Sequence, residues 1–270
     1  MSTTAGTVGA AGTPAITIDR SAPPVPMSRL VKVEARKMFD TRSGFWLMVS
    51  IGVLALVATI AVIAFIDGAD LNYGAFATAI GVPMAVLLPV MAILSVTSEW
   101  SQRTGLTTFT LVPHRGRIIG AKAITSVVVG AVSMLLALAI GALGNVVGSL
   151  IRGADMTWNV TVADVARIVL INVLGLMIGF MLGVLIRNSP AAIVGYFVYS
   201  FVVPTIFGAL AGAQDWFADL QPWVDFNYSL NRMYENAPAE SWATLAVSGV
   251  IWLVIPLAIG VRAIMRSEVK

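Results

Sequence analysis

The sequence predicts an all-α integral membrane protein with six transmembrane helices, and three observations support this fold class. Of the 270 residues, 58% are hydrophobic and only 11% are charged, and the mean hydropathy is +0.88. Soluble domains carry about 25% charged residues, and they do not bury this much apolar surface. Six apolar stretches are each long enough to cross a bilayer core, which takes about 20 helical residues. None of the six has Asp, Glu, Lys or Arg in its interior.

The chain divides into a membrane domain and short flanking segments. Residues 1–26 are rich in Ala, Gly, Ser, Thr and Pro and lack the basic and apolar runs of a secretion signal. We therefore expect a disordered cytoplasmic tail there. We expect the six-helix domain over 44–264 and a second cytoplasmic tail over 265–270. The predicted spans are 44–66, 75–97, 123–150, 168–186, 191–213 and 242–261.

The distribution of basic residues predicts that both termini are cytoplasmic. With the N-terminus inside, 14 Lys and Arg residues fall on the cytoplasmic side and three, Arg152, Arg167 and Arg232, fall outside. Cytoplasmic flanks of membrane proteins carry the excess of Lys and Arg. We therefore expect a multi-pass protein of the plasma (cytoplasmic) membrane.

Residues 27–43 predict an amphipathic helix before the first span. Apolar residues recur there at helical spacing, and most basic residues fall on other faces. Such a helix lies flat in the membrane interface with its cations near anionic lipid head groups. The alternative is a helical positive-inside flank without an interfacial role. The residues assigned to the interfacial helix are Arg29, Lys32, Arg36, Lys37 and Phe39.

The predicted extracytoplasmic loop, 214–241, is rich in aromatic residues. Amphipathic rings suit the membrane–water interface. Short helices that re-enter the outer leaflet and a loop anchored by its aromatic side chains both fit this composition. The aromatic residues in and beside the loop are Trp216, Phe217, Trp223, Phe226, Tyr228, Tyr234 and Trp242.

Several function classes lack the residues they need. The chain has no Cys and a single His, His114, which argues against disulfides, thiolate sites and clustered metal ligands. Spans without carboxylates or histidines argue against ion-coupled transport and intramembrane catalysis. Residues 116–122 only faintly match a phosphate-binding loop, because three residues separate the glycines and Ala123 follows the lysine. We expect a chain that is not itself an enzyme, binds no cofactor and takes any energy from another polypeptide.

Small residues and prolines predict close helix contacts and bends. Glycines recur every fourth position in the predicted spans three, four and five, which favours either internal helix packing or contact between subunits. Pro83 and Pro89 in span two each free a backbone carbonyl and bend the helix. The bend fits a cavity lining, a hinge or a static kink.

The connection between spans two and three, 98–122, is the most specific part of the chain. It opens with Glu99 and closes with Arg115, Arg117 and Lys122 around a short segment, 107–112, that can form a surface helix ended by Pro113. Charges on both sides of a compact helix suit docking of a cytoplasmic partner. The alternative is a basic loop that only fixes topology.

This connection resembles that of the permease subunits of type-2 ATP-binding-cassette (ABC) exporters. The wider frame, over 27–270, is also similar: an amphipathic helix, six spans with both ends inside, and a long aromatic loop between spans five and six. The residues of the matching pattern are Glu99, Arg103, Gly105, Thr107, Pro113, Arg115 and Lys122.

The resemblance implies a permease dimer, with a second copy or a sister permease, that binds two copies of a separate ABC ATPase holding ATP and Mg²⁺. It implies contact of the interfacial helix and the 98–122 connection, including Arg117, with that ATPase. It also implies that spans two and five line the substrate path, which makes Pro83, Pro89, Pro204 and Phe201 path candidates.

From this we expect efflux of a hydrophobic or amphipathic substrate, such as a drug, an antibiotic, a peptide or a lipid, with membrane lipids as neighbours and no nucleic acid as a partner. The leading alternative is a membrane scaffold or assembly factor without transport. A membrane-embedded enzyme and a secondary transporter are weaker alternatives, because the spans lack the groups that those functions need.

Overall fold

The computed structural model describes residues 25–101, 115–234 and 238–266, and this part of the chain is helical throughout, apart from short connections. Six helices in it are long and apolar enough to cross a membrane, which makes the chain a multi-pass membrane protein. They are Arg42–Phe65, Tyr73–Trp100, Gly116–Arg152, Val162–Ile186, Ser189–Ala213 and Ala239–Arg266.

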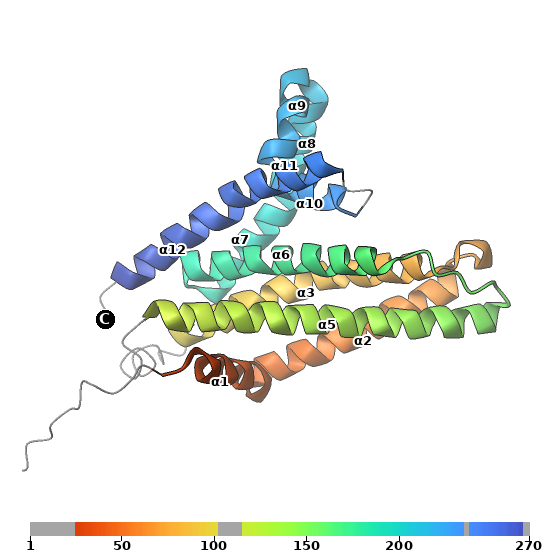
Figure 1. The fold of residues 1–270 in the computed structure, drawn as a ribbon, viewed down its shortest axis with the longest axis horizontal. Coiled ribbons are helices and arrows are strands. Elements are labelled where there is room, and N and C mark those ends of the chain that lie inside the picture. Colours follow the sequence, from red (N-terminus) through yellow and green to blue (C-terminus); the bar gives the residue numbers. More distant parts are fainter. Residues whose placement is uncertain (1–24, 102–114, 235–237, 267–270) are drawn as a thin grey trace, which may run out of the picture.

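Four long helices form the body of the molecule. These are α2 (Arg42–Phe65), α3 (Tyr73–Ser101), α5 (Arg115–Arg152) and α6 (Val162–Ile186), which lie side by side in Figure 1. α1 (Met27–Asp40) lies across one end of this bundle. The end of α12 lies near the same end, where Gly116 is within reach of Met265.

The remaining helices pack against one side of the bundle and extend away from it (Figure 1). In an apolar 18-residue stretch of span five, only 11% of the residues are buried, against 50% in the corresponding stretch of α6. Most residues of span five are therefore not covered by the rest of the single chain. The elements of this part are α7 (Ser189–Phe197), η2 (Val198–Val202), α8 (Val203–Ala213), α9 (Asp215–Val224), α10 (Phe226–Arg232), α11 (Ala239–Gly249), η3 (Val250–Val254) and α12 (Ile255–Arg266).

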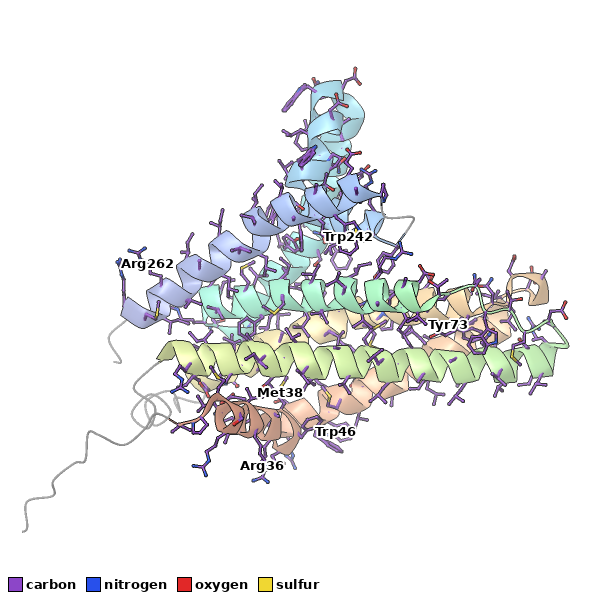
Figure 2. All side chains as sticks on the ribbon, viewed as in Figure 1. Arg36, Met38, Trp46, Tyr73, Trp242 and Arg262 are labelled. Atoms are coloured by element: carbon purple, nitrogen blue, oxygen red, sulfur yellow. The ribbon has the colours of Figure 1, made fainter. Side chains whose placement is uncertain are left out.

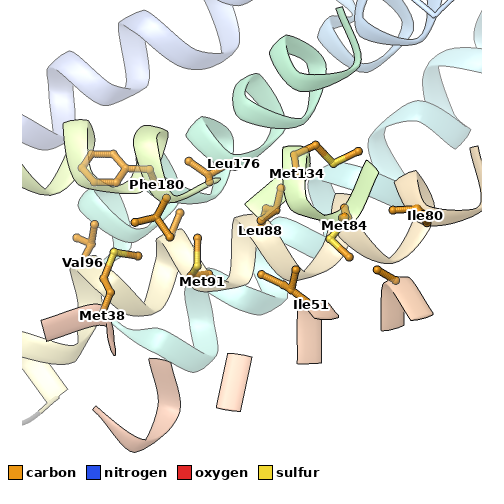
Figure 3. Close-up of a cluster of buried hydrophobic side chains, with 14 of the residues drawn as sticks. Met38, Ile51, Ile80, Met84, Leu88, Met91, Val96, Met134, Leu176 and Phe180 are labelled. Atoms are coloured by element: carbon orange, nitrogen blue, oxygen red, sulfur yellow. The ribbon is translucent and has the colours of Figure 1, made fainter. Parts of the chain in front are cut away.

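The main core fills the space between α2, α3, α5 and α6 (Figure 3). Met84, Leu88, Leu176 and Phe180 are fully buried there. α3 and α6 approach so closely that a Cβ added at Gly179 would lie 2.5 Å from the carbonyl oxygen of Pro89. The glycine repeat in span four therefore serves internal packing at this position.

The other two glycine repeats differ in their surroundings. Gly144 and Gly148 pack against side chains of α2 and α3, where an added Cβ would lie within 3.0 Å of Thr59 and Ile63. Gly208 and Gly212 face open space, with no atom within 4 Å of an added Cβ. Internal packing is thus confirmed for span three but not for span five.

Most spans extend beyond their predicted boundaries. α5 has 38 residues, so at 1.5 Å per residue it is about 57 Å long, nearly twice the hydrocarbon thickness. The interval 98–122 is consequently helical at both ends: α3 continues through Ser101, and α5 begins at Arg115. The prediction of a single connecting loop over 98–122 was wrong for these two ends.

Spans five and six each contain a π-helical segment, η2 and η3. The rings of Tyr199 and Trp252, one from each segment, lie 5.3 Å apart. Trp252 also donates a hydrogen bond to the carbonyl of Val224 at the end of α9. The two widened turns are therefore joined to each other and to the short helices between the spans.

The aromatic stretch between spans five and six forms two short helices, α9 and α10. The buried Asp225 side chain accepts a hydrogen bond from the backbone N–H of Tyr228 at the start of α10 and another from the Gln221 amide. These bonds fix the turn between the helices. In its described residues, this stretch forms short helices rather than an irregular loop.

Candidate functional site

The corner between α1 and α2 positions the candidate site. Thr41 separates the two helices, and its side chain accepts a hydrogen bond from the N–H of Gly44, which caps α2. A Cβ at Gly44 would lie 1.8 Å from the carbonyl oxygen of Met38, so only glycine fits this corner. The amphipathic helix therefore ends at Asp40, three residues earlier than predicted.

α1 presents two different faces. Arg29, Lys32 and Arg36 are exposed, and Arg36 points away from the bundle in Figure 2. Met38 is buried in the main core (Figure 3). Phe39, the next residue along α1, is 52% exposed.

Four charged side chains meet where α1 crosses the ends of α3 and α5. Lys122 Nζ lies 2.5 Å from Glu34 Oε2 and 3.1 Å from Glu99 Oε1. Lys37 Nζ lies 2.8 Å from Glu34 Oε1 and 2.9 Å from Glu99 Oε1. Two carboxylates and two ammonium groups make the set neutral. We call these four residues the charge cluster.

Burial makes the pairing in the charge cluster necessary. Glu34, Glu99 and Lys122 are 7%, 6% and 5% exposed, and a buried charge without a partner is strongly unfavourable. Lys122 also donates a hydrogen bond to the Ser95 carbonyl. The cluster therefore ties α1, α3 and α5 together through side chains that each need the others.

Lys37 is the cluster member that reaches solvent, with 41% of its side chain exposed. Burial lowers its pKa, but the hydrogen bonds to Glu34 and Glu99 raise it by more, so the pKa of Lys37 lies above its ordinary value of 10.5. Lys37 is thus positively charged at neutral pH. It points into the cluster, whereas the sequence placed it among the outward basic residues of α1.

The structure changes the interpretation of two predicted coupling residues. Glu99 and Lys122 lie inside the protein and bind α1, so they do not form an outward docking surface. Arg117 donates a hydrogen bond to the carbonyl of Val25, just before α1. The coupling residues that lie outside the described residues are Arg103, Gly105, Thr107 and Pro113, and the side chain of Arg115 also lies outside this description.

Glu34 is the cluster residue that the sequence prediction missed. It follows Leu30 by four residues and precedes Met38 by four, so it falls on the apolar face of α1. A carboxylate on the buried face of a helix needs a cationic partner from elsewhere. The position of Glu34 on the apolar face could therefore have indicated a buried ion pair. Its partner is Lys122, 88 residues later in the sequence.

A cavity of about 280 Å³ adjoins the charge cluster. The four cluster residues line it together with apolar side chains of α1, α2 and α3 and with several hydroxyl groups. The apolar residues are Met38, Leu47, Met91 and Leu94, and the hydroxyl-bearing residues are Thr41, Ser43, Ser95, Ser98 and Thr125. Within the described residues, Glu99 Oε2 is buried and has no hydrogen-bond partner. The cavity therefore has a mixed polar and apolar lining, and the unpaired carboxylate oxygen lies buried beside it.

The residues predicted to line a substrate path do not form one surface of this chain. Pro89 is buried between α3 and α6, so it is not exposed beside a path within the single chain. Phe201 is 59% exposed and stacks on Phe197, with ring centroids 6.0 Å apart. Pro83 and Pro204 are half-buried.

Comparison of the sequence with models of known families and with curated proteins gave no match.

Proposed function

We propose that this chain is the membrane-spanning permease subunit of an ATP-driven exporter of the type-2 ABC class. It would move a hydrophobic or amphipathic substrate out of the cytoplasm, and a separate ATPase subunit would supply the energy. The chain would work as a dimer, with a second copy or a sister permease, in the plasma membrane. The chain itself would bind no nucleotide, because ATP and Mg²⁺ would sit on the ATPase.

The observation that carries the proposal is the charge cluster, because two of its members flank the 102–114 segment in the sequence. Glu99 lies three residues before that segment, and Lys122 lies eight residues after it. Both bind α1 through Glu34 and Lys37. A force applied to this segment by a partner would reach α3, α5 and α1 together. A permease driven from outside the membrane needs such a rigid connection.

The charge distribution supports the proposed orientation. The excess of basic residues favours a cytoplasmic location for the charge cluster, both termini and the 102–114 segment. In this orientation α1 lies in the cytoplasmic interface, with Arg29, Lys32 and Arg36 near anionic head groups. α9 and α10 then lie at the opposite side, in the outer leaflet.

The apolar character of the spans supports the proposed substrate class. Charged residues of the spanning helices lie within about two turns of the helix ends, with Lys122 of α5 and Arg167 of α6 among those outside the terminal turn. The spans therefore offer an ion no fixed charge near the bilayer centre. They offer apolar surface, which suits a substrate that partitions from the membrane.

The experiment is reconstitution of the chain with an ATPase that copurifies with it, followed by measurement of ATP turnover in proteoliposomes. We expect Arg115→Ala to weaken ATPase binding and Glu99→Gln to leave binding intact while it lowers turnover that depends on the permease. Asp219→Ala, an exposed change on α9 at the opposite side of the membrane domain, is the matched control. A folded, inserted chain that binds no ATPase, or a Glu99→Gln variant with normal turnover, would contradict the proposal.

A further inference from the structure

We propose that the hydroxyl of Tyr196 takes the place of the N–H that Pro89 lacks, and that it thereby couples the bend of α3 to the π-helical segment of span five. Tyr196 is a positioning residue, because it acts by holding two spans in one arrangement. This inference goes beyond the proposed function, and its test requires only the purified chain.

The first observation is a backbone acceptor that Pro89 leaves without its helical donor. In an α-helix, the N–H of residue 89 binds the carbonyl of residue 85, but proline has no N–H. Ala85 lies near the middle of the apolar stretch 75–97 and is exposed on the surface of the single chain. Lipid tails cannot donate a hydrogen bond, so a carbonyl at this depth needs a donor from the protein.

Tyr196 of α7 supplies this donor. Its hydroxyl donates a hydrogen bond to the carbonyl of Ala85, with 2.5 Å between the two oxygens. The Tyr196 side chain is only 5% exposed, and it belongs to the core cluster that includes Ile93 of α3 and Ile178 of α6. This packing restricts the ring and keeps its hydroxyl at the proline bend.

The same hydroxyl also contacts the π-helical segment η2. It forms a hydrogen bond with the side chain of Ser200, which lies inside η2, and a phenol can donate one hydrogen bond while it accepts another. In η2 the N–H of Val203 binds the carbonyl of Val198, five residues earlier, so this turn is wider than an α-helical turn. One hydroxyl group therefore joins the bend of α3 to the widened turn of span five.

A separate contact attaches the start of span five to α3. The hydroxyl oxygens of Thr97 and Ser189 lie 2.7 Å apart, and Tyr196 follows Ser189 by about two helical turns. Beyond η2, span five continues as α8, which has no buried residue. Loss of the Tyr196 hydroxyl should therefore release η2 and α8 from α3, while the start of α7 stays attached.

The first test measures the unfolding equilibrium of the full chain in mixed detergent micelles. Tyr196→Phe should raise the equilibrium constant for unfolding at least about threefold, the usual effect of a hydrogen bond between membrane helices. Tyr199→Phe is the matched control, because that buried hydroxyl has no partner among the described residues, and it should change the constant little. Pro89→Ala restores the N–H, so Tyr196→Phe should have a smaller effect in that variant. Equal effects of the two tyrosine changes, or an effect of Tyr196→Phe that is the same with and without Pro89, would overturn the proposal.

The second test separates coupling of the spans from stability. The chain has no cysteine, so spin labels on cysteines placed at the exposed positions Val82 of α3 and Ile206 of α8 report the distance between the two spans. We expect a narrow distance distribution in the labelled parent and a broader one in Tyr196→Phe. Pro89→Ala combined with Tyr196→Phe should recover stability but keep the broad distribution, because the Ala85 carbonyl is then satisfied while the spans remain unjoined. A distribution that stays narrow in Tyr196→Phe would refute the coupling, even if Pro89→Ala failed to fold.

Discussion

Replacement of Lys122 by Met should destabilise the protein strongly, because it leaves two buried carboxylates facing one ammonium. Lys122 is 5% exposed and contacts Glu34, Glu99 and the Ser95 carbonyl at 2.5, 3.1 and 3.1 Å. Removing one partner of a buried ion pair costs about 3–5 kcal/mol. For a chain of this size, that corresponds to a fall of about 6–20 °C in Tm.

The assay is thermal unfolding in detergent, followed by tryptophan fluorescence and by the loss of monodisperse protein. Lys32→Met, an exposed change on the same helix as Glu34, should shift Tm little and is the matched control. The double variant Lys122→Met with Glu34→Gln restores neutrality, so it should be less destabilised than the two single changes added together. A Lys122→Met protein as stable as Lys32→Met, or strictly additive effects, would refute the role of the charge cluster.

Three further predictions test other parts of the structure by the same unfolding assay. Gly179→Ala should cost about 1–3 kcal/mol, because its Cβ would press on the Pro89 backbone. Gly175→Ala, with no atom within 4 Å of an added Cβ, should not, and equal effects would argue against the tight α3–α6 contact. Asp225→Ala should cost about 1–2 kcal/mol by removing the cap of α10, while exposed Asp215→Ala serves as the control; no difference between them would exclude the capping role. The stabilisation from Lys37 should be fully present below pH 10.5 and lost as the pH rises through its raised pKa, and Lys37→Met should abolish that loss; an unchanged alkaline profile in Lys37→Met would contradict it.

The helical membrane fold could be predicted from composition and apolar run length, since a bilayer requires both. The ends of the helices could not, because α3 and α5 continue past the apolar stretches into charged residues. Those residues stay helical since Glu99 and Lys122 find partners on α1. Single-segment periodicity contains no information about a partner 62 or 88 residues away.

The candidate site was predicted only in part for the same reason. Glu99 and Lys122 were singled out by their place around the 102–114 segment, but that place did not reveal that both side chains are buried against α1. Helical spacing assigned Met38 and Phe39 to one apolar face, and it could not indicate that Met38 enters the protein core while Phe39 stays exposed on the protein.

The neutrality of the charge cluster has a consequence for biogenesis. During synthesis, Glu34 and Lys37 emerge long before Glu99 and Lys122, so α1 cannot bury its carboxylate when it first reaches the membrane. Docking of α1 must wait until α3 and the start of α5 have been inserted. α1 therefore reaches its final position only after α3 and the start of α5 are in place, and the charge cluster closes only around a correctly inserted α2–α3–α5 unit.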